Sequence, residues 1–213
     1  MLVVILSACG SKEQRTTRAE AIAKTRFFVD RYGQIVSPKQ RIYLTYLQNR
    51  LTAAFDKSFT KNEQFEIVLL NTRYPIAASA GGGVVMISKG VVNALQNEAE
   101  LAFILAHEMS HQYLNHRPPA IDGFFPEMDE KIELEADRLA AAAMSVAGYD
   151  PRYAITALKN TYHYAGSLIS EKKDYPSLEK RVKEISSLIS SSGWQPPGTV
   201  NRREFVDFRK SLS

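Results

Sequence analysis

Apolar residues recur every three or four positions along most of the chain, which is the spacing of amphipathic helices. The pattern predicts helices over residues 18–32, 38–55, 90–95, 97–115, 127–147, 150–164 and 176–189, and a terminal helical turn in the last dozen residues. Two runs rich in β-forming residues, 65–70 and 84–88, predict strands. Three glycines at 81–83 indicate a tight turn, a close approach of other backbone or a flexible hairpin loop. The expected fold is α+β and mainly helical, with a small sheet or hairpin.

Composition limits the classes to which this chain can belong. Its 213 residues, 45% hydrophobic and 23% charged, suffice for one globular domain with a sizeable core. The formal net charge of +4 is small, and acidic residues are interspersed among the basic ones. A nucleic-acid-binding protein typically presents one dense basic face, so we expect no nucleic-acid partner. The oligomeric state does not follow from the sequence.

The single cysteine, Cys9, ends the sequence Leu6-Ser7-Ala8-Cys9, which has the form of a bacterial lipobox. Acylation of such a cysteine with several chains anchors a protein stably to a membrane. The apolar segment before it is short and carries no Lys or Arg, so a start assigned too late or an unrelated apolar N-terminus is the alternative. Gly10 follows in place of the Asp that commonly retains lipoproteins in the inner membrane. The expected location is therefore the bacterial outer membrane, facing the periplasm.

Candidate chemistry lies in His107-Glu108-Met109-Ser110-His111, within the predicted helix 97–115. Residues four apart share a helix face, so both imidazoles can bind one metal ion. From the next position, Glu108 can reach a water in the open coordination site and is a candidate general base. The alternative is a chance pattern of two packed or exposed histidines. His116 lies about 140° around the helix from His111 and is not expected to be a ligand.

A third ligand is predicted on the helix that follows the next loop. Glu133 and Asp137 are again four apart, and the short loop favours an antiparallel hairpin that brings Glu133 against the two histidines. Two His and one Glu with an open fourth position form a catalytic rather than a structural zinc site, with one Zn²⁺ per chain. Asp137 can accept a hydrogen bond from the other ring nitrogen of a ligand histidine and so orient it.

This combination of motifs resembles the zinc metallopeptidases that include HtpX, the CAAX prenyl endopeptidases and BepA. The likeness runs from about residue 65 to residue 189 and takes in the glycine turn and strand 82–88, residues 98–101, both metal motifs and Ala-Gly-Tyr-Asp-Pro at 147–151. Metzincins need a glycine and a third histidine where this chain has Leu114 and Arg117, which excludes that subclass. The resemblance implies a zincin-like domain over 21–190, after a signal segment 1–9 and a tether 10–20, and before a tail 191–213.

The resemblance also implies a function, namely endopeptidase hydrolysis of unfolded or misassembled envelope proteins in quality control. Its partners would be extended or unfolded polypeptides, which strand 84–88 at the rim of the cleft could bind by strand addition. Where the family often has His-Pro, this chain has Tyr175-Pro176. Tyr175 could gate the zinc weakly, donate a hydrogen bond to a developing oxyanion, or pack. The alternatives are a zinc-binding, chaperone-like or regulated lipoprotein of low activity, and a structural lipoprotein without metal.

Overall fold

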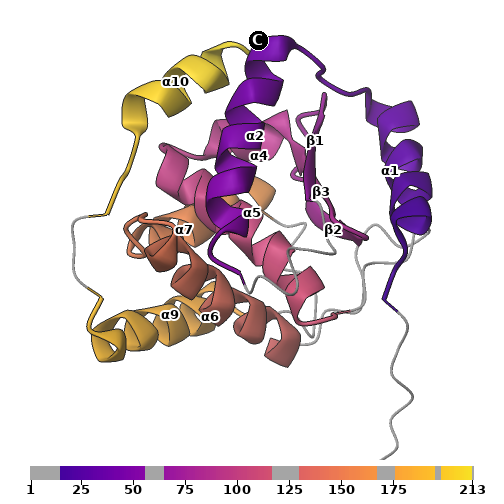
Figure 1. The fold of residues 1–213 in the computed structure, drawn as a ribbon. Coiled ribbons are helices and arrows are strands. Elements are labelled where there is room, and N and C mark those ends of the chain that lie inside the picture. The colour runs from indigo at the N-terminus through magenta and orange to yellow at the C-terminus, as the bar shows by residue number, and fades with distance from the viewer. Residues whose placement is uncertain (1–14, 56–64, 117–129, 167–175, 195–197, 213) are drawn as a thin grey trace, which may run out of the picture.

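The computed structural model describes residues 15–55, 65–116, 130–166, 176–194 and 198–212 (Figure 1). In chain order its elements are α1 (Arg18–Tyr32), α2 (Pro38–Thr52), β1 (Glu66–Leu70), β2 (Ala77–Gly81), β3 (Val84–Ser88), α4 (Lys89–Ala94), α5 (Glu98–Tyr113), α6 (Glu130–Val146), α7 (Tyr153–Ala165), α9 (Leu178–Ser192) and α10 (Arg202–Lys210). The predicted class, a mainly helical α+β domain with a small sheet, is confirmed. Within these ranges, no helix combines the length and apolarity that crossing a membrane requires.

The sheet lies between α1 and the remaining helices, as Figure 1 shows. Successive residues of a strand face opposite sides of a sheet, and β3 is buried on both. Its Val85 and Ile87 belong to the main core with α5, whereas Val84 and Met86 belong to a smaller cluster that Ala21 of α1 completes. Burial on both faces explains why the sequence of β3 is a continuous apolar run rather than an alternating one.

The strand order β1-β3-β2 corrects the expectation that strand 84–88 binds substrate. β3 pairs with β1 in parallel and with β2 antiparallel, so both of its edges are occupied. The outer strands of the described sheet are β1 and β2, and the sequence pattern missed β2. Its residues, Ala77-Ala78-Ser79-Ala80-Gly81, are small and include none of the β-branched or aromatic types that mark strands.

The turn between β2 and β3 is both tight and closely covered by another segment. Gly81, Gly82 and Gly83 have φ values of +80°, +50° and +81°, which residues with a Cβ rarely adopt. A Cβ on Gly82 would lie 2.7 Å from the backbone oxygen of Thr17 and 2.8 Å from Cα of Arg18. The glycines therefore allow the start of α1 to lie directly on the turn. Residues 18–20, assigned to the tether, are already part of α1.

The centre of the domain is α5, where all residues except His111 and Tyr113 are buried. Its N-terminus is capped by Asn97, whose side chain accepts a hydrogen bond from the backbone N–H of Glu100. The middle of the helix, residues 101–106, is apolar on every side, and such a segment lies inside a core. The helix contacts β2, α2, α6 and α7, among other elements.

Glu98 ties the first turn of α5 to distant parts of the chain. Its carboxylate is fully buried and accepts hydrogen bonds from the hydroxyls of Tyr43 and Tyr149, both at 2.8 Å, and from Nδ2 of Asn201 at 2.6 Å. Burial and the neighbouring Glu98 charge raise the pKa of both tyrosines, so they stay protonated donors. A buried anion is tolerated because it is fully hydrogen-bonded and lies at the positive end of a helix dipole.

The C-terminal residues are part of this core rather than a separate tail. Phe205 and Phe208 of α10 are buried in the main cluster, and the ring of Phe208 stacks on Tyr43 with a centroid distance of 4.3 Å. The expectation of a terminal helical turn holds, but α10 also packs on α2 and α5. Helix α10, within the range assigned to a tail, therefore contributes to the stability of the domain.

The glycine turn generates a stability prediction. Gly82→Ala should lower the free energy of unfolding by on the order of 3 kcal/mol, because the new methyl group meets backbone atoms in addition to adopting a strained φ. Gly193→Ala is the matched control, since Gly193 is in the left-handed region, with φ +66° and ψ 15°, and has no atom within 4 Å of an added Cβ. That variant should lose about 1 kcal/mol. Urea unfolding measures both, and equal losses would show that the contact with α1 contributes nothing.

Candidate metal centre

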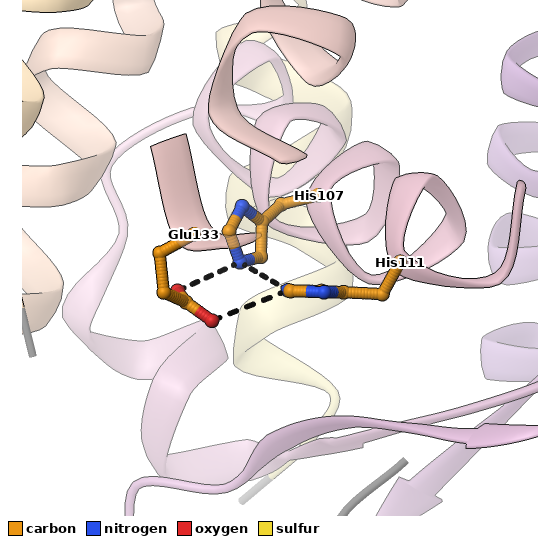
Figure 2. Close-up of side chains that lie close together, drawn as sticks. All are labelled: His107, His111 and Glu133. Carbon is orange, nitrogen blue, oxygen red and sulfur yellow. Dashed lines mark hydrogen bonds and ion pairs between the residues drawn. The ribbon is translucent and has the colours of Figure 1, made fainter. Parts of the chain in front are cut away.

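Figure 2 shows the three predicted ligands turned toward one another. His107 and His111 lie one turn apart on α5, and Glu133 faces them from the first turn of α6. Nε2 of His107 is 3.0 Å from Nε2 of His111, and each of these nitrogens is 3.4 Å from an oxygen of the Glu133 carboxylate. These three are the described residues whose ligand atoms cluster within 4.8 Å.

The spacing fits a tetrahedral zinc site. Zinc–nitrogen and zinc–oxygen bonds of about 2.0–2.2 Å at tetrahedral angles place ligand atoms roughly 3.3 Å apart. The observed separations of 3.0 and 3.4 Å bracket that value. Three protein ligands leave one position of the tetrahedron open, as in catalytic rather than structural sites.

The protonation states of the three residues are compatible with a cation bound between them. The pKa of Glu133 is held at about 2: burial raises it, but hydrogen bonding and charge from His107, with the charge of Arg181, outweigh burial. Burial lowers the pKa of His107, yet Asp137 and Glu133 more than offset that and raise it to about 10. Without a cation, His107 therefore carries a proton that a metal ion has to displace. His111 is neutral, because burial and the neighbouring His107 lower its pKa to about 3.

Asp137 lies behind His107, as the sequence predicted for an orienting carboxylate. Its Oδ1 is 3.0 Å from Nδ1 of His107, although that nitrogen makes no well-aligned hydrogen bond within the described part of the chain. Asp137 is fully buried and is held by Arg181 of α9 through two contacts, Nε to Oδ2 at 2.7 Å and Nη2 to Oδ1 at 2.5 Å. This paired arrangement fixes the carboxylate and keeps its pKa below the usual range, against the effect of burial.

Glu108 is buried beside the cluster and does not belong to the ligand set. Burial raises the pKa of its carboxyl to about 7, and charge from His107 and a backbone hydrogen bond from Ser79 of β2 act in the opposite direction. A divalent cation at the histidines would lower the pKa of Glu108 from this raised value and favour the carboxylate at neutral pH. The geometry therefore provides a base between the metal ligands and the edge strand.

Comparison with known proteins agrees with this site. Residues 44–124 match the profile of peptidase family M48. The chain is similar to peptidase family M48 over this segment. The match includes His107, Glu108 and His111, and it confirms the resemblance to the HtpX and CAAX peptidases. M48 peptidases are zinc-dependent, which agrees with a cluster able to hold a metal ion. Glu133 lies beyond the matched range, so its assignment as the third ligand rests on the geometry of the α5–α6 pair.

Relatives of this chain include the mitochondrial metalloendopeptidase OMA1 of Schizosaccharomyces pombe, 23% identical over 203 residues that cover 80% of this chain and 58% of that protein. The mitochondrial metalloendopeptidase OMA1 of Arabidopsis thaliana is 23% identical over 167 residues, which cover 66% of this chain and 34% of that protein. The chain thus spans less than two thirds of the length of either relative.

Some residues at or near the site were missed by the sequence analysis or lie outside the described part of the chain. Tyr175 and Cys9 are outside the described residues, so their roles stay predictions. Nothing in the sequence indicated that Arg181 is buried and pairs with Asp137 of α6. His116 lies outside the cluster of three candidate ligands, and its ring contacts the ring of His111.

The Arg181–Asp137 pair generates a second stability prediction, for metal-free protein. Arg181→Met should lower the free energy of unfolding by on the order of 3 kcal/mol, because Asp137 loses two charge-assisted hydrogen bonds and keeps only His107 as a nearby positive charge. Adding Asp137→Asn should recover part of that loss. Arg138→Met is the control, because Arg138 also links α6 to α9 but pairs with Glu184 on the surface. It should cost no more than about 1 kcal/mol. Equal losses in the two single variants, measured by urea unfolding, would contradict a buried charge pair.

Proposed function

We propose that this chain is a zinc-dependent metalloendopeptidase that holds one Zn²⁺ through His107, His111 and Glu133. The observation that carries the proposal is the convergence of these three ligand atoms beside the buried carboxylate of Glu108. A purely structural zinc site would be closed by a fourth protein ligand and would need no adjacent base. The family match and the metalloendopeptidase relatives support the same activity.

Bound zinc supplies Lewis acidity, which polarises a peptide carbonyl and acidifies water. The part of the chain in the reaction is to position and move protons. Glu108 accepts the proton of the attacking water and delivers it to the nitrogen of the leaving amine, so it is regenerated as a carboxylate. The hydrogen bond from the Ser79 backbone holds that carboxylate in place, and Asp137 orients His107.

We assign the substrate-binding edge to β2 instead of β3. Opposed residues of an antiparallel pair alternate between hydrogen-bonded and non-hydrogen-bonded pairs. Ser88 donates to the carbonyl of Ile76, so Ala77 and Ser79, at the alternate positions, direct their backbone groups away from β3. The Ser79 N–H points to Glu108 in this way. An extended polypeptide paired along Ala77 would therefore run past the metal ligands, which favours unfolded segments as substrates.

The proposed biological role is proteolytic quality control of unfolded or misassembled proteins at the bacterial envelope, by a lipid-anchored protein on the periplasmic face of the outer membrane. The support for this role is the resemblance to HtpX and BepA and the lipobox that ends at Cys9. The alternative, a zinc-binding protein of low activity that holds rather than cleaves polypeptides, is separated by the first experiment below.

Metal binding and catalysis should separate in two variants. Glu133→Ala should lose zinc after dialysis, because one of three protein ligands is gone, whereas Glu108→Gln should retain about one zinc per chain. Casein digestion should nevertheless fall by about 10²–10⁴-fold in Glu108→Gln, because the amide cannot accept the proton. Elemental analysis and digestion rates measure the two effects.

Glu130→Ala is the control for loss of a glutamate from the same helix, since Glu130 pairs with Lys180 on the surface, and it should keep both zinc and activity. Zinc retention in Glu133→Ala would move the third ligand elsewhere. A wild type that binds zinc and peptide but cleaves neither casein nor unfolded protein would favour the holding function.

The anchor generates a separate prediction. Protein expressed in a Gram-negative host from its own start should begin at an acylated Cys9 and sediment with membranes, because each buried CH₂ of the acyl chains contributes about 0.8 kcal/mol. Cys9→Ser should be soluble or unprocessed, and Ser7→Ala, which keeps a small residue before the cysteine, should behave as wild type. Mass spectrometry of the mature N-terminus decides the outcome. An unlipidated, freely soluble wild type would contradict the location and leave the metal site untouched.

A further inference from the structure

A Schellman motif at the end of α5 returns the chain onto the metal ligands. Asn115 has a left-handed φ of +58°, its N–H donates to the carbonyl of Gln112, and the N–H of His116 donates to the carbonyl of His111 at 2.8 Å. A helix continued to residue 115 would have turned His116 about 140° away from His111. Because α5 ends at Tyr113 and the chain turns back at Asn115, the side chain of His116 lies over His111.

The two rings are joined through their inner nitrogens. Nδ1 of His116 lies 2.9 Å from Nδ1 of His111, and the ring planes cross at 64°. The side chains of His116 and His111 are 10% and 13% exposed, so water competes little for this contact. Nε2 of His116 lies 3.5 Å from Oε2 of Glu135, which is two residues after Glu133 on α6. Glu135, His116 and His111 thus form a chain that leads to the metal cluster.

Only one proton arrangement allows His111 to bind a metal through Nε2. Its proton then has to sit on Nδ1, and of two nitrogens 2.9 Å apart only one can donate. Nδ1 of His111 therefore donates, Nδ1 of His116 accepts, and the proton of His116 lies on Nε2, facing Glu135. His107 has its own partner in Asp137, so each ligand histidine is backed by a different group.

We propose that His116 is a positioning residue, which holds His111 in the tautomer and ring orientation that metal binding requires, with Glu135 orienting His116 in turn. The inference rests on the proposed zinc site. Partners of this kind typically contribute about 10–100-fold to metal affinity. Glu135 is 38% exposed and its contact is long, so its own contribution should be smaller than that of His116.

The test measures zinc affinity of the full chain by competition with a chelator of known affinity. His116→Phe keeps a flat ring but removes the acceptor, and affinity should fall by about 10–100-fold. His116→Asn places an amide oxygen near the position of Nδ1 and should recover most of that loss. Glu135→Leu should lower affinity by a few-fold. His163→Phe is the control for loss of an exposed histidine on α7 and should leave affinity unchanged. A structural role alone would not be rescued by asparagine.

Unchanged zinc affinity in His116→Phe would overturn the proposal. So would an equal loss of zinc affinity in the Phe and Asn variants with an equal fall in the midpoint of urea unfolding, because His116 would then only pack. A wild type that binds no zinc would instead contradict the proposed function, and this inference with it. Because the chelator competition needs no substrate, a failure of catalysis alone leaves the assignment of His116 intact.

Discussion

The constraint on which the structure depends is the burial of α5 with charged groups at both of its ends. A polar group inside a core must find partners, since an unpaired one costs several kcal/mol. At the N-terminal end, Glu98 finds them in α2, in the segment after α6 and beside α10. At the C-terminal end, His107 and Glu108 find them in α6 and β2. The arrangement of the other elements around α5 follows from satisfying these groups.

The cluster of candidate metal ligands could be predicted from the sequence because the spacing within each pair is local. His107 and His111 share a face for any α-helix, and so do Glu133 and Asp137. The short connection then left antiparallel packing as the simplest way to bring the two faces together. The fold class was accessible for the same reason, since long periodic helices are a strong signal.

What the sequence did not show depends on tertiary contacts. β2 consists of small residues that fit between α1 and α5, so its pairing is decided by space and not by propensity. Arg181 carries no sign in the sequence that it is buried, because arginine is usually exposed. The expected position of His116, about 140° around the helix from His111, was wrong. The helix was expected to continue to residue 115, whereas Asn115 adopts a left-handed conformation and reverses the chain. In each case the error arose at an element boundary or across a distant contact.

The pairing of Arg181 with Asp137 gives α9 a part in metal binding, although it contributes no ligand. Arg181 holds Asp137, and Asp137 orients His107, so a metal ion and a docked α9 favour the same arrangement. By thermodynamic linkage, docking of α9 and binding of a metal ion stabilise each other by the same coupling free energy. During synthesis, α5 and α6 leave the ribosome well before Arg181 does. If the proposed metal site forms, a nascent chain would therefore hold the metal weakly until α9 is in place.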